Sequence, residues 1–80
     1  MVEKAIILAF IVFAKVVLRK AKKAKTYGDI RSILTYVDTF MEDMDNKFPQ
    51  INDNAAINEE NAKAFAAEVE SAANTLDHAR

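Results

Sequence analysis

The stretch AIILAFIVFAKVVLRKAKKAK, residues 5–25, decides how this chain folds, because its first ten residues carry no polar side chain. On a period of 3.6 residues, every face of a helix over residues 5–14 is therefore apolar. A helix that is apolar all round lies either deep inside a protein or in lipid. Five basic side chains then follow within residues 19–25. The two features together predict a first helix whose surroundings differ from those of the rest of the chain.

Apolarity and flanking charge favour a membrane anchor for this first segment, whereas its length is short for one. As a helix, residues 5–18 span about 21 Å, which is short of the roughly 30 Å hydrocarbon core of a bilayer. Lys15 lies near one boundary, where its long side chain can reach the headgroups. Basic residues beside a membrane span stay on the cytoplasmic side. We therefore expect a single-pass protein with its N-terminus outside and its acidic remainder on the cytoplasmic side.

The anchor prediction assigns two groups of side chains to the membrane. Ten apolar residues are expected to contact lipid: Ile6, Ile7, Leu8, Phe10, Ile11, Val12, Phe13, Val16, Val17 and Leu18. Five basic residues are expected to contact anionic headgroups or other phosphates: Arg19, Lys20, Lys22, Lys23 and Lys25. Nucleic acid is not an expected partner, because no aromatic side chain is interleaved for base stacking. A secretory signal peptide is disfavoured by the dense positive charge after the apolar run, whereas burial of the segment inside a protein oligomer stays open.

The net charge of −1 is the sum of two strongly charged parts. Residues 1–25 carry seven basic side chains against one acidic, and residues 26–80 carry four basic against eleven acidic. Such asymmetry indicates different surroundings for the two parts. The sequence thus predicts an anchor with a basic flank over residues 1–25 and an acidic helical hairpin over residues 26–80.

The second part shows the periodicity of amphipathic helices. One Gly and one Pro in the chain leave too few turn signals for a β fold, so an all-α fold is expected, with an antiparallel hairpin after the apolar helix. Asp29 is expected to cap one helix that ends before Phe48, and Asn52 or Asp53 to cap another that runs through Leu76. Residues expected to pack between helices are Ile30, Leu34, Val37, Met41, Met44, Phe65, Val69, Ala72 and Leu76.

Catalytic or metal-binding chemistry has little support in the sequence. There is no Cys, and the single histidine, His78, stands at the frayed end of the chain. A calcium loop starting at Asp43 would need Gly at its sixth position and Glu at its twelfth, where the chain has Phe48 and Asn54. We therefore expect no catalytic residue, no metal site, no cofactor and no enzymatic activity.

A helical hairpin of this size cannot enclose a core, and small domains without disulfides or metals usually need oligomerisation. Other protein chains, identical or different, are therefore expected partners besides membrane lipid. The favoured function is a small membrane-anchored structural or accessory subunit of a membrane or virion assembly, which docks through amphipathic helices. The first alternative is a soluble helical assembly protein, such as a filament or capsid subunit, with the first helix buried in the oligomer. A membrane-disrupting peptide of the holin or toxin kind is the weaker alternative.

Overall fold

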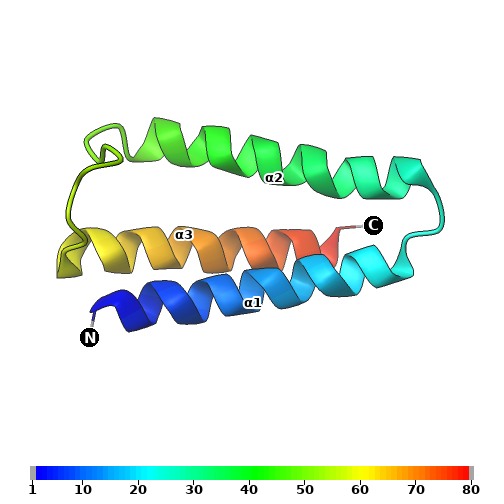
Figure 1. Cartoon of the computed structure of the whole chain (residues 1–80), viewed down its shortest axis with the longest axis horizontal. Coiled ribbons are helices and arrows are strands. Elements are labelled where there is room, and N and C mark those ends of the chain that lie inside the picture. The colour runs from blue at the N-terminus through cyan, green and yellow to red at the C-terminus, as the bar shows by residue number, and fades with distance from the viewer. Residues whose placement is uncertain (1, 80) are drawn as a thin grey trace.

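The computed structural model describes residues 2–79, which form three helices, α1 (Val2–Lys23), α2 (Tyr27–Lys47) and α3 (Glu59–His78), and no strand. The helices lie side by side in an elongated bundle of 41 × 23 × 19 Å. Figure 1 shows that α1 and α3 run in the same direction. The helix that connects them in the chain, α2, runs in the opposite direction. The all-α prediction is confirmed, and α2 and α3 form the two antiparallel arms of the predicted hairpin.

The main helix contact joins α1 to α3, along most of the length of both helices. Ala9 of α1 and Val69 of α3, both fully buried, belong to one of the two core clusters along this contact. Most of the buried residues of α3 are alanines, namely Ala62, Ala66, Ala72 and Ala73. Because the distance between helix axes depends on side-chain size at the contact, these alanines let α1 approach α3 closely. The small-residue seam of α3 thus faces α1, not α2 as a two-helix hairpin would require.

The second helix, α2, makes fewer contacts with the other two. Met44 is its buried residue and packs in one cluster with Ala9 and Val69. The ring of Phe40 stacks on that of Phe13 in α1, with centroids 5.4 Å apart. Figure 1 accordingly shows α2 set apart from the α1–α3 pair.

Local signals set the helix starts, although at other residues than the sequence predicted. Thr26 is the N-cap of α2, and its hydroxyl accepts from the Asp29 backbone N–H at 3.2 Å, so Asp29 completes a capping box from inside the helix. Asn58, rather than Asn52 or Asp53, caps α3 by accepting from the Asn61 backbone N–H at 2.9 Å. Asn52 instead accepts from the Asn54 backbone N–H and closes an Asx turn, which lengthens the connection to residues 48–58.

The predicted membrane span is not supported by the structure. Within residues 2–79, none of the helices combines the length and the apolarity that a bilayer crossing needs. The physical reason lies in the basic residues: α1 is 22 residues long, but Lys4, Lys15, Arg19 and Lys20 interrupt any window of spanning length. Its apolar residues, moreover, pack partly against α3 of the same chain.

Candidate docking surfaces

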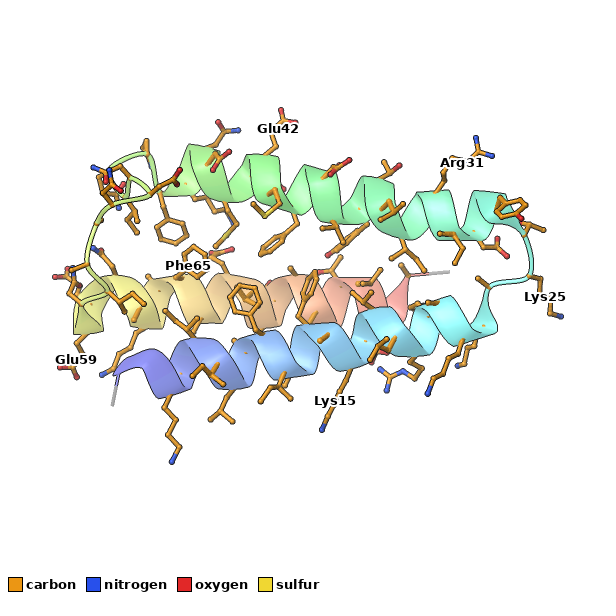
Figure 2. All side chains as sticks on the ribbon, in the orientation of Figure 1. Lys15, Lys25, Arg31, Glu42, Glu59 and Phe65 are labelled. Carbon is orange, nitrogen blue, oxygen red and sulfur yellow. The ribbon has the colours of Figure 1, made fainter. Side chains whose placement is uncertain are left out.

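The side of α1 that faces away from α3 is apolar and basic. We call it the α1 outer surface. Its residues are Lys4, Ile7, Leu8, Ile11, Lys15, Leu18 and Lys22, all of them exposed. Its four apolar members are between 44% and 58% exposed. In Figure 2, the Lys15 side chain points away from the other two helices. Because residues 5–14 of α1 are apolar on every side and α3 covers one side, apolar surface is left facing outward.

The predicted lipid-facing residues are therefore divided between two environments. Val16 is buried, and Ile6, Phe13 and Val17 pack partly buried against the core clusters. The other six are exposed, namely Ile7, Leu8, Phe10, Ile11, Val12 and Leu18. The bundle thus buries, fully or partly, less than half of the predicted anchor residues and leaves the rest exposed.

The predicted headgroup-binding residues are divided in a similar way. Arg19 forms a salt bridge with Asp77, and the Lys20 ammonium donates to the carbonyl oxygen of Ala79. These two contacts join the C-terminal end of α1 to the C-terminal end of α3. A positive charge at the C-terminus of a helix also interacts favourably with the helix dipole. The remaining three, Lys22, Lys23 and Lys25, are exposed. Two of them line a shallow hollow on α1, which is formed by Lys15, Leu18, Arg19, Lys22 and Lys23.

The predicted packing residues are also found in two places. Met44, Val69, Ala72 and Leu76 are buried, and Val37 and Phe65 are partly buried. Ile30, Leu34 and Met41 instead lie exposed on α2, so they take no part in the buried contact within one chain, and their packing against another helix stays a prediction. The cause is the shallow contact of α2, which buries a narrow strip around Tyr36, Phe40 and Met44 and leaves the neighbouring side chains in solvent.

These exposed residues belong to a second surface, which we call the α2 outer surface. It consists of Tyr27, Ile30, Arg31, Leu34, Asp38, Met41 and Asp45. Figure 2 shows Arg31 pointing away from the bundle on the side opposite to Lys15. In the sequence, the apolar residues of this segment fit a single helical stripe, so the pattern alone does not separate this surface from the packed side of α2. Leu34, Asp38, Met41 and Asp45 follow one another at steps of four, three and four. This spacing was the signal in the sequence that could have revealed the second surface.

Two polar contacts hold α2 in place and leave its outer surface free. The Tyr36 hydroxyl donates to the carbonyl oxygen of Ala72 at 2.7 Å. The Lys47 ammonium lies 2.7 Å from a carboxylate oxygen of Glu68, and this hydrogen bond raises the pKa of Lys47. Both contacts lie on the side of α2 that faces α3.

Two further observations on residues 2–79 concern metal binding and one hollow of the bundle. Within residues 2–79, no group of three or more His, Cys, Asp or Glu side chains is placed to hold a metal ion. A hollow of about 260 Å³ between α1, the loop and the start of α3 is lined by apolar side chains except for Asn61. Its lining residues are Ile6, Phe10, Ile51, Ala55, Ala56, Ile57, Asn61, Ala62 and Phe65. An asparagine amide in an apolar wall has neither the nucleophile nor the general base that catalysis needs.

Comparison of the chain with protein-family models, with curated proteins and with solved structures found no match. The two outer surfaces are therefore the features from which a function can be inferred.

Proposed function

We propose that this chain is a non-enzymatic structural protein that joins a larger helical assembly through the α1 outer surface. The observation that carries the proposal is the exposure of Ile7, Leu8, Ile11 and Leu18 on one side of a helix whose other side is already packed. A contiguous apolar patch of this kind on a small protein is typical of an interaction site.

The position of the lysines supports a protein partner. Along α1, Lys4, Leu8, Ile11, Lys15, Leu18 and Lys22 follow one another at steps of four and three, which is the spacing of a helix–helix seam. Lys15 thus stands within the apolar stripe, not at its edge. In a helix lying flat in a bilayer surface, charged residues occupy the polar face. A partner helix with an acidic residue opposite Lys15 satisfies this charge, whereas acyl chains do not.

Photocrosslinking tests this proposal in cells that make the protein. A benzophenone amino acid replaces Ile11 on the α1 outer surface, and the matched control carries it at Asn74, an exposed position of α3. The proposal predicts a discrete protein–protein adduct from position 11 and much less from position 74. The absence of any protein adduct from position 11 would contradict it.

Docking to an anionic membrane surface is the second candidate function, favoured by the seven basic side chains of residues 1–25. In this version the chain is a peripheral accessory subunit of a membrane assembly. Vesicle flotation separates the two candidates. Binding to vesicles with anionic lipid but not to neutral vesicles, together with lipid adducts from position 11, supports the membrane version.

A further inference from the structure

We propose that the partner of the α1 outer surface is the α2 outer surface of a second copy of this chain, with the two helices parallel. This inference rests on the proposed function and names its partner. It starts from the spacing of the two surfaces. Six residues of α2, Tyr27, Arg31, Leu34, Asp38, Met41 and Asp45, follow steps of four, three, four, three and four. The six seam residues of α1 follow the same steps from Lys4 to Lys22.

Aligning the two surfaces in parallel pairs apolar residues with apolar residues. Ile11 then lies opposite Leu34, and Leu18 lies opposite Met41. All four side chains are exposed within one copy, each by at least 44%. Pairing them removes this apolar area from water, which is the main favourable term in helix association.

The same register pairs opposite charges at the positions between. Lys15 lies opposite Asp38, and Lys22 lies opposite Asp45. These four side chains are exposed in the bundle, so they are available to an outside partner. Charge pairs of this kind fix register and partner more than they add affinity.

The two remaining positions of the seam are also accommodated. Lys4 lies opposite Tyr27, a residue that is 86% exposed and whose ring can receive the ammonium on its face. Arg31 lies opposite Leu8, where the aliphatic part of the arginine can cover the leucine while its guanidinium stays in water.

Other pairings of the same surfaces fit less well. Antiparallel pairing of α1 with α2 places Ile11 opposite Asp38 and Lys15 opposite Leu34. Parallel pairing of two α1 surfaces places Lys15 against Lys15. Each of these leaves a charge against an apolar or like-charged side chain, which disfavours the contact.

The arrangement of the bundle determines what such pairing builds. Arg31 of the α2 outer surface and Lys15 of the α1 outer surface point to opposite sides of the molecule (Figure 2), from which we infer that two copies cannot satisfy both contacts with each other. The contact is therefore heterologous, and it continues into an open strand of copies. Within one copy, α1 and α2 run in opposite directions. Parallel pairing of α1 with α2 of the next copy therefore reverses the direction of each copy relative to the one before it.

Charge reversal at the central pair tests this inference. Chains carrying Lys15→Asp place Asp against Asp38, and chains carrying Asp38→Lys place Lys15 against Lys. Both positions are exposed, and circular dichroism of each variant verifies that the bundle is folded. Each variant alone is expected to assemble at least about tenfold more weakly than the parent chain, by sedimentation velocity or light scattering.

Mixing the two variants provides the decisive arm of the experiment. In a 1:1 mixture, every contact between unlike chains pairs opposite charges, so assembly is expected to recover with alternating chains. Lys25→Asp, the same charge change at an exposed residue outside both surfaces, is expected to leave assembly unchanged. A parent chain that stays monomeric at high concentration, or a mixture that does not recover, would overturn the inference. If position 11 still crosslinks to a different protein in cells, the proposed function stands without self-assembly.

Discussion

Tyr36 of α2 donates a hydrogen bond of 2.7 Å from its hydroxyl to the backbone carbonyl oxygen of Ala72 in α3. This contact matters because α2 buries little apolar surface of its own, with Met44 as the buried residue of that helix. A side-chain hydrogen bond of this kind therefore contributes more to the placement of α2 than it would in a densely packed bundle.

Replacement of Tyr36 by Phe removes the hydroxyl and keeps the ring. We expect the free energy of unfolding to fall by about 1 kcal/mol, the typical net worth of one hydrogen bond, as measured by urea denaturation. Tyr27→Phe is the control, since Tyr27 is 86% exposed, and it should change stability very little. Equal effects of the two substitutions would show that the Tyr36 hydroxyl does not anchor α2.

The core contact between α1 and α3 gives a second prediction. Val69 is fully buried, whereas Val12 is 44% exposed on α1. Val69→Ala removes two buried methyl groups and is expected to cost about 2 kcal/mol of unfolding free energy. Val12→Ala makes the same chemical change where much of the side chain already meets water. The loss of unfolding free energy for Val12→Ala should therefore be well under half of the loss for Val69→Ala. Similar losses for both variants would contradict the packing of α1 on α3.

The capping box at the start of α2 predicts a pH effect. Hydrogen bonds from the backbone N–H groups of Lys25 and Thr26 hold the pKa of Asp29 below its ordinary value. A carboxylate with a lowered pKa in the folded state stabilises the fold above its unfolded pKa. That contribution is lost as the pH falls from about 4 through the lowered value.

Asp29→Asn isolates this contribution from that of the other carboxylates. At pH 7 the variant should have a lower Tm than the parent chain, because the amide is a weaker acceptor than the carboxylate. The difference in Tm between the two chains should shrink as the pH falls below about 4. A Tm difference that is constant between pH 7 and pH 2 would show that ionised Asp29 plays no part in the cap.

Much of the fold follows from local signals in the sequence. The 3.6-residue periodicity after Tyr27 and the break at Phe48 and Pro49 place α2, and the end of α2 at Lys47 agrees with the structure. The start of α3 was misplaced because Asn52, Asp53 and Asn58 are equally good caps by residue type. The choice among them depends on where α3 meets α1, which is not a local property.

The environment of α1 was harder to predict. A run without polar residues indicates burial, but it does not say whether lipid or protein covers the helix. The deciding residues lie sixty positions away, in the alanines of α3 around Val69. The α2 outer surface was missed for a related reason. Leu34 and Met41 fit an inward stripe as well as an outward one until the partner of α2 is known.

Disulfide crosslinking tests the central claim most directly, because the chain has no cysteine of its own. Chains carrying Ile11→Cys are mixed with chains carrying Leu34→Cys, and in a second mixture with chains carrying Asp38→Cys, under mild oxidation. The parallel contact between α1 and α2 of different copies predicts rapid formation of the 11–34 disulfide and slow formation of the 11–38 disulfide. Faster formation of the 11–38 disulfide, or linkage confined to pairs of position 11, would contradict this account.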